Sequence, residues 1–122
     1  MHYALLIYAA PDATDVPSHA DDGVIDNWVA YAQATKDAGV LVAAEQLLDV
    51  DTATTVRLRG GERLLTDGPF IETKEHLLGF FLVDVPDLDT AIDWAGRVPL
   101  IRFGTVEVRP VRKGMAWQAV LE

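Results

Sequence analysis

Residues 79–85 of the chain read GFFLVDV, and this stretch decides the fold. Successive side chains of a β-strand point to opposite faces of its sheet, and here both sets of alternating positions are almost entirely apolar. Residues 3–9, YALLIYA, show the same two-sided pattern, with Tyr3, Leu5 and Ile7 on one side. Such strands are typical of positions covered on both faces, so we expect these two strands at the centre of one sheet.

A helix is expected after each of these strands. The first has capping-box spacing at Ser18 and Asp21 and a C-terminal glycine, Gly39. The second begins after Asp87, whose side chain can cap it, and ends at Pro99. Apolar or small residues recur at three- and four-residue steps along the first helix, which gives it one apolar stripe for packing on a sheet. These residues are Val24, Ile25, Trp28, Tyr31, Ala32, Thr35 and Ala38.

The other strands follow from alternation and turn residues. Residues 54–59 alternate polar with apolar side chains, and glycines 60–61 supply a turn before residues 63–65, so we expect a β-hairpin. Residues 41–47 indicate a second strand or an extended edge segment, and residues 105–109 a last strand. This order predicts an α+β fold with an antiparallel sheet, the ferredoxin-like split βαβ, elaborated by one extra hairpin.

The number of layers predicts an assembly. Two helices cover only one face of such a sheet, so apolar residues on the other face need a second cover. We expect a homodimer in which two sheets pack face to face. The alternative is that the extra hairpin and the C-terminal residues 115–117 cover this face within one chain.

Length and composition limit the class of protein. The 122 residues suit one domain, residues 1–122, and half of them are hydrophobic. A formal charge of −9 argues against nucleic acid and anionic membranes as partners, because both attract basic residues. No apolar run approaches the roughly 20 residues of a spanning helix. The chain has no cysteine and no export signal is expected, which favours the cytoplasm.

Residues 66–76, TDGPFIETKEH, form the best candidate site, because ionisable groups are densest there and lie beside turn residues. Glycine tolerates a positive φ, whereas proline fixes its own φ and lacks an N–H. The Asp-Gly-Pro run at residues 67–69 therefore aims the side chains that follow it in reproducible directions. Preorganised loops of this kind suit binding sites.

The run DGPF-x-E-x-K-E at residues 67–75, together with residues 79–80 and 87–99, resembles the DGPF branch of the YCII-related family. The resemblance covers nearly the whole chain. It implies a dimeric ferredoxin-like fold, the dimeric α/β barrel, with a cleft near the dimer interface. Some members of the family lie beside sigma factors, and one relative is a dehydrochlorinase of a chlorinated aromatic. The His and Asp pair proposed for the YCII branch does not match this chain motif for motif.

Five ionisable residues of this segment are candidate catalytic groups: Asp67, Glu72, Lys74, Glu75 and His76. A carboxylate beside a lysine or histidine can act as a general base, and imidazole is the usual proton shuttle at neutral pH. The structural alternative is a salt-bridged loop that orients the hairpin, with Asp67 capping the turn through its own backbone.

Four further residues are candidate substrate-binding groups. Phe70, Tyr8 and Trp28 would offer aromatic surface, and Arg102 would clamp a carboxylate. No metal and no organic cofactor is expected. The acidic segment around His19 matches no ligand spacing, and glycines 60–61 lack the helix and basic residue of a phosphate loop.

Two functions remain open at this point. The first is an acid–base enzyme that acts on a small organic substrate, for example an aromatic one, in a cleft at residues 67–76, without metal or cofactor. The second is a non-catalytic dimer that binds a small ligand or a regulatory protein such as a sigma factor. The sequence contains no complete catalytic motif that would decide between them.

Overall fold

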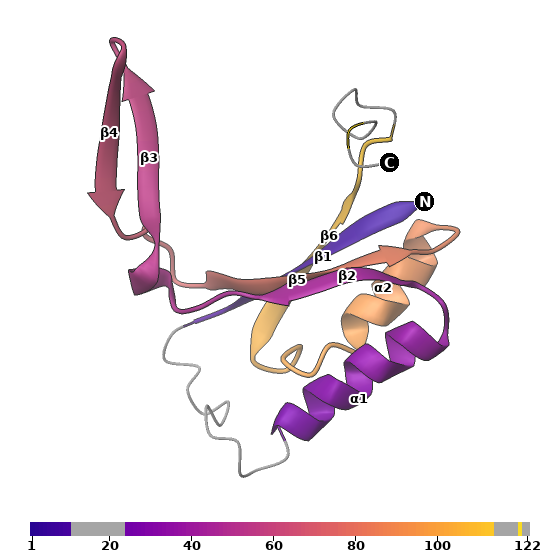
Figure 1. Ribbon diagram of the computed structural model, residues 1–122. Helices are drawn as coiled ribbons and strands as arrows, with labels where there is room; N and C mark the ends of the chain where they lie inside the picture. The colour runs from indigo at the N-terminus through magenta and orange to yellow at the C-terminus, as the bar shows by residue number, and fades with distance from the viewer. Residues whose placement is uncertain (11–23, 114–119, 121–122) are drawn as a thin grey trace.

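A computed structural model describes residues 1–10, 24–113 and 120. Its elements form a four-stranded sheet, two helices and a separate two-stranded hairpin (Figure 1). In chain order they are β1 (His2–Ala9), α1 (Val24–Asp37), β2 (Leu41–Gln46), the short 3-10 helix η2 (Val50–Thr52), β3 (Thr54–Arg59), β4 (Glu62–Asp67), β5 (His76–Asp84), α2 (Leu88–Gly96) and β6 (Gly104–Pro110).

The sheet has the strand order β2-β5-β1-β6, and each neighbouring pair is antiparallel. Strands β1 and β5, the two with apolar residues on both faces, are therefore central, as the sequence predicts. One helix follows β1 and the other follows β5, and both lie on the same side of the sheet (Figure 1). The α+β prediction is confirmed, and the topology is compatible with the ferredoxin-like fold.

The core lies between the sheet and the two helices. Leu5 on β1 and Val83 on β5 are both 0% exposed there. Tyr31 of α1 is also buried, and its hydroxyl donates a hydrogen bond of 2.8 Å to the backbone oxygen of Trp94 in α2. Burial raises the pKa of Tyr31 to about 12, because the charged phenolate would be poorly solvated. This bond ties the two helices together beneath the sheet.

The opposite side of the sheet carries a second apolar layer, which we call the open face. Ala4 and Leu6 of β1 lie opposite Leu82 and Phe80 of β5 there, and all four are only partly buried. No helix of the described chain lies on this side of the sheet (Figure 1). Both faces of the central strands are therefore apolar, but the chain described here covers only one of them with helices.

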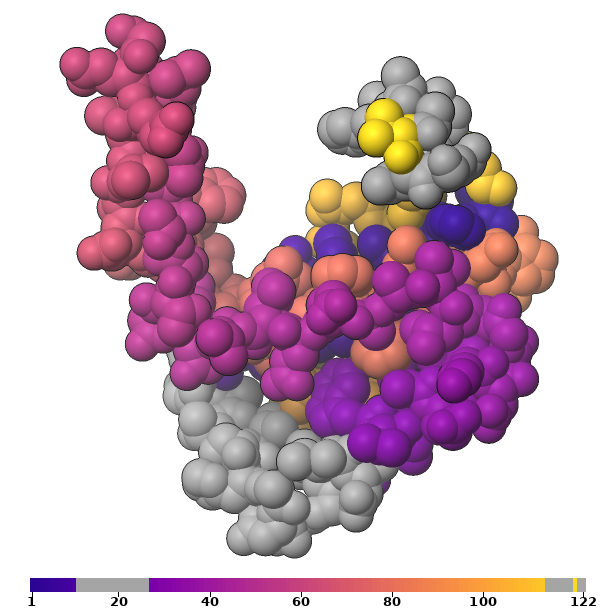
Figure 2. Space-filling model, viewed as in Figure 1, coloured from indigo at the N-terminus to yellow at the C-terminus, as the bar shows by residue number. Residues whose placement is uncertain are grey.

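The β3–β4 hairpin, residues 54–67, projects away from the sheet on the side opposite the helices, and we call it the arm (Figure 1). Both glycines at its tip, Gly60 and Gly61, have positive φ angles, as a tight two-residue hairpin turn requires. The space-filling view shows the arm standing clear of the rest of the molecule (Figure 2). The predicted hairpin is confirmed, but it adds a separate ribbon rather than strands to the main sheet.

Helix boundaries agree with the sequence at one end and differ at the other. The Asp87 side chain caps α2 by accepting a hydrogen bond of 2.8 Å from the Thr90 backbone N–H, as expected. The helix was expected to end at Pro99 but ends at Gly96, because the Arg97 N–H turns back to the Trp94 oxygen. The proposed cap at residues 18–21 and the C-terminal residues 115–117 lie outside the described residues.

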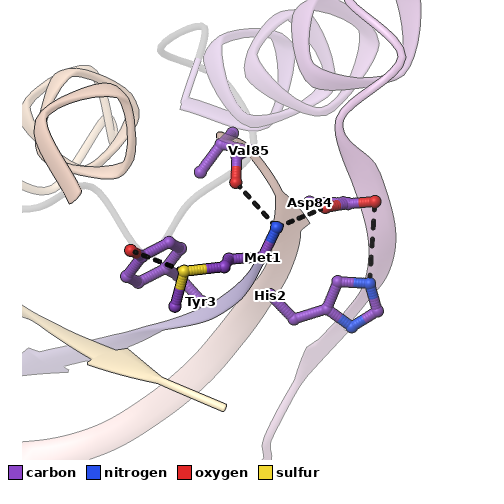
Figure 3. A network of polar contacts seen from close by, with 5 residues as sticks. All are labelled: Met1, His2, Tyr3, Asp84 and Val85. Carbon is purple, nitrogen blue, oxygen red and sulfur yellow. Dashed lines mark hydrogen bonds and ion pairs between the residues drawn. The ribbon is translucent and has the colours of Figure 1, made fainter. Parts of the chain in front are cut away.

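The first residue of the chain fastens β1 to the end of β5 (Figure 3). The amino group of Met1 lies 3.1 Å from an Asp84 carboxylate oxygen and donates to the Val85 backbone oxygen at 3.0 Å. His2 Nε2 lies 3.7 Å from the other oxygen of Asp84. The hydrogen bond from the amino group lowers the pKa of Asp84. This network closes the end of the sheet that lies away from the arm.

Candidate functional site

A cleft of about 570 Å³ opens where the arm joins the sheet. Three segments form it: the end of β1, the linker from β2 to β3, and the loop from β4 into β5. Its walls are therefore built from parts of the chain that are distant in sequence. The lining residues are Tyr8, Leu47, Leu48, Asp49, Val50, Thr52, Ala53, Pro69, Phe70, Ile71, Thr73, Glu75, His76 and Leu77.

The turn after β4 fixes one wall of the cleft. Gly68 has a φ of 95°, a conformation that side chains other than glycine rarely adopt. Its N–H donates to the Ala53 oxygen at 2.7 Å, and the Thr55 hydroxyl donates to the Gly68 oxygen at 2.7 Å. Gly68 is thus hydrogen-bonded through both its N–H and its carbonyl oxygen to residues 53 and 55, at the start of β3. Pro69 and Phe70 enter the cleft from this anchored point.

Glu75 is the best positioned carboxylate of the cleft. It is partly buried, and its Oε1 accepts a hydrogen bond of 2.8 Å from the Thr105 hydroxyl on β6. The Thr73 hydroxyl donates to the backbone oxygen of Glu75. His76, the first residue of β5, is partly buried and lines the cleft as well. A carboxylate and an imidazole therefore line one cavity, the first from the end of the loop before β5 with a hydrogen bond to β6, the second from the first residue of β5.

Tyr8 of β1 lines the same cleft and carries a hydroxyl. This hydroxyl lies 3.4 Å from Oε1 of Glu107, a long hydrogen bond, while Arg109 donates to the other carboxylate oxygen at 2.6 Å. The contact with Arg109 is the main cause that lowers the pKa of Glu107. The Glu107 carboxylate is thus engaged on both oxygens, and the Tyr8 hydroxyl remains able to accept a hydrogen bond from a ligand.

Most of the remaining cleft surface is hydrocarbon. Leu48 and Phe70 are 82% and 66% exposed, and Ile71 is also exposed. Large apolar side chains that converge on a cavity beside a few polar groups are typical of sites for small organic molecules. The arrangement suits a compact apolar ligand that carries at least one group able to hydrogen-bond or exchange a proton.

The structure separates the nine residues singled out from the sequence. Tyr8, Phe70, Glu75 and His76 line one cleft, whereas the following five do not. Asp67, Glu72 and Lys74 are exposed outside it, and Arg102 is exposed in the loop before β6. Trp28 stacks on Phe81 in the core, with ring centroids 6.3 Å apart.

Other contributors to the site carry no local sequence signal. Thr105, which holds Glu75, belongs to a strand 30 residues further along the chain. Residues 47–50, 52 and 53 line one side of the cleft, yet the sequence indicated only the end of an edge strand there. The position of Thr105 opposite Tyr8 in the β1–β6 register was the one available clue, and it requires the sheet order to be known.

Three structural questions from the sequence can be addressed within the described chain. No ion pair found there involves residues 66–76, so the salt-bridged loop has no support in these residues. No group of three or more His, Asp or Glu residues suited to a metal ion occurs among residues 1–10, 24–113 and 120. The acidic segment around His19 lies outside these ranges. None of the helices described is long and apolar enough to cross a membrane.

Fold and cleft together define a small α+β protein with a four-stranded antiparallel sheet, one projecting arm and a candidate ligand site at the root of the arm. Comparison with known proteins identifies the family. The model of the YCII-related domain matches residues 1–115. An uncharacterized protein of Rhizobium meliloti (strain 1021) is 38% identical over 114 residues, which span 91% of this chain and 92% of the relative. The chain belongs to the YCII-related family, which confirms the resemblance at the level of the family.

Proposed function

We propose that this YCII-related protein is a cofactor-independent acid–base catalyst that acts on a small organic substrate with an apolar body, such as an aromatic ring. The observation that carries this proposal is the placement of Glu75 and His76 on the same largely hydrocarbon cleft. Of the five ionisable residues considered from the sequence, these two meet a cavity. The apolar walls would exclude water and strengthen the interaction of both groups with a bound substrate.

Each of these cleft residues would have a separate role in the reaction. Glu75 would accept a proton from the substrate, and Thr105 would hold its carboxylate in a fixed orientation by their 2.8 Å hydrogen bond. His76 would donate a proton at a second position or to a leaving group. Tyr8 would orient the substrate by a hydrogen bond, and Phe70 would pack against its apolar body. Isomerisation and elimination are the reaction classes that need only these groups.

The substrate class can be sought directly. A panel of small phenols, aromatic carboxylic acids and halogenated aromatics is screened for binding by ligand-observed NMR, and each binder is mapped on ¹⁵N-labelled protein. We expect binders to shift the amide signals of Phe70, His76 and Leu77. Binders are then incubated with the protein, and changes in their own spectra report turnover. Binding without turnover of any binder would favour the non-catalytic ligand-binding alternative.

Variants test the assigned roles once a turned-over compound is known. Glu75→Gln should lower kcat by about 100-fold or more, since general acid–base catalysis contributes roughly this factor. His76→Gln should have an effect of similar size. Glu72→Gln is the matched control, because Glu72 lies in the same loop but outside the cleft, and it should leave kcat within about twofold. Equal activity of the Glu75 and Glu72 variants would refute the proposed site.

We also propose that the protein forms a homodimer in which two open faces pack together, the dimeric α/β-barrel assembly. The supporting observation is the partly exposed apolar layer of Leu6, Phe80 and Leu82 on the face without helices. Sedimentation equilibrium should give a dimer that Phe80→Glu dissociates. Val29→Glu is the control, because Val29 is exposed on α1, on the helix side. A wild-type monomer at about 100 μM would contradict the assembly, since a stable interface binds more tightly than this.

A further inference from the structure

The arm has one apolar face and one polar face. Cross-strand pairing places Val56 beside Leu65, with Leu58 next along the same face. These three side chains are 62%, 64% and 66% exposed. The opposite face carries Thr55, Thr66 and three charged residues near the tip, and Leu64 is its one large apolar residue. One charged residue of the tip, Arg63, pairs with Leu58 on the apolar face itself. The arm is therefore an amphipathic ribbon whose apolar side has no cover among the described residues.

A ribbon of this kind is not stable by itself in water. Two paired strands of six residues each lie near the lower limit of independent stability, and a third layer or strand is normally needed. All residues of the arm except Thr55 are exposed, so the body of the chain gives it little support. An exposed apolar surface on such an element indicates that it docks on another molecule.

The charge of the arm indicates the molecule on which it docks. Residues 57–63 at the end of the arm contain Arg57, Arg59, Arg63 and one acidic residue, Glu62, a net charge of +2. The complete chain carries −9, so the remainder of the molecule is strongly acidic. A basic arm on an acidic body is electrostatically complementary to a second copy of the same chain.

The position of the arm relative to the sheet also fits a second copy of the chain as the partner. The arm rises on the side of the sheet away from the helices, which is the side of the open face (Figure 1). The space-filling view shows a wide notch between the arm and the body (Figure 2). The arm and the open face of one chain thus border a single concave space. A two-fold symmetric dimer would fill both notches at once, because each partner presents the same surfaces.

We infer that the arm of each protomer clasps a second copy of the chain, with Val56, Leu58 and Leu65 packed against the partner's body. This inference rests on the homodimer proposed above and adds to it a reciprocal pair of clasps. The clasped partner also covers the exposed rim of the cleft at Leu48 and Phe70, since this rim lies at the root of the arm. The ligand site is therefore complete only in the dimer.

The first experiment compares the two faces of the arm. The triple variant Val56→Thr, Leu58→Thr, Leu65→Thr keeps residues that favour strands but removes most of the apolar surface. We expect its dimer dissociation constant, measured by sedimentation, to rise by about 100-fold. Leu64→Thr on the opposite face is the matched control and should change the constant by less than about twofold. Similar effects of the two variants would overturn the inference.

The second experiment locates the arm directly. The chain has no cysteine, so Leu58→Cys introduces a single thiol that a benzophenone maleimide labels selectively. Labelled ¹⁴N protein is mixed with unlabelled ¹⁵N protein, illuminated, and digested for mass spectrometry. We expect cross-links that join a light arm peptide to a heavy body peptide.

The results distinguish the clasp from the homodimer. A dimer whose label joins only peptides of its own chain overturns the clasp and leaves the homodimer standing. A monomeric wild type overturns both. None of these readouts depends on turnover, so an inactive cleft would leave the clasp unaffected.

Discussion

The body and the arm are built from the same kind of strand but differ in what covers their apolar faces. On β1, Leu5 is completely buried beneath the helices, whereas Leu58 at an equivalent alternating position of β3 is mostly exposed. The pattern of a strand therefore specifies which face is apolar. It does not specify whether the cover comes from the same chain, and this difference is what makes the arm a candidate for contact with a partner.

The largest expected contrast comes from truncating one leucine in each region. Leu5→Ala leaves a cavity in the core and should lower the free energy of unfolding by about 3–4 kcal/mol. Leu58→Ala should lower it by less than about 0.5 kcal/mol, when both are measured by urea denaturation at a protein concentration that disfavours dimers. Equal losses for the two variants would mean that the arm packs on its own body.

Glycine substitutions should give a smaller contrast. A Cβ at Gly79 would lie 2.5 Å from the Glu45 backbone oxygen, so Gly79→Ala must push β2 away from β5. We expect a loss of about 2–3 kcal/mol and a lower Tm. A Cβ at Gly61 meets nothing within 4 Å, and Gly61→Ala should cost only about 1 kcal/mol because of its positive φ. A milder effect at Gly79 than at Gly61 would show that β2 is loosely attached.

The smallest predicted effect is confined to the body and depends on pH. The pKa of Tyr31 is raised from 10.0 to about 12, so the folded state holds this proton more tightly than the unfolded state does. The resulting stability is present below pH 10 and lost as the pH rises toward 12. Wild type should lose about 1–2 kcal/mol more than Tyr31→Phe over this interval, after allowance for screening by solvent.

Urea titrations of both proteins at several pH values measure this difference. The hydroxyl of Tyr31 bonds to Trp94, so the variant should also be somewhat less stable at neutral pH. Parallel alkaline losses in the two proteins would show that Tyr31 ionises freely in the folded state.

Local patterns predict the elements of this protein well and its cavity only in part. The two-sided runs placed β1 and β5 at the centre, and Asp87 marked the start of α2, because strand burial and capping act over a few residues. The sequence did not predict the end of α2 at Gly96. The Arg97 N–H bonds to the Trp94 oxygen, and this bond ends the helix three residues before Pro99.

The candidate site shows the same limit. The segment with Glu75 and His76 stood out because ionisable groups and turn residues are adjacent in sequence. Trp28 was a candidate substrate-binding residue, but its ring packs on Phe81. This contact depends on how α1 lies on the sheet. The lining from residues 47–50, 52 and 53 and the support from Thr105 depend on strand order and register, and no short stretch of sequence contains that information.

The anchored turn at Gly68 has a mechanical consequence. Six residues of strand span about 20 Å, so the arm is a lever of that length with its pivot at the turn. A change of about 15° in the pivot would move the tip by roughly 5 Å, more than the width of a methyl group and close to the spacing of neighbouring strands. The two hydrogen bonds on Gly68 and the ring of Pro69 thus restrict the positions that Arg59 and Arg63 can take at the tip of the arm. The turn at Gly68 therefore controls where the tip of the arm lies.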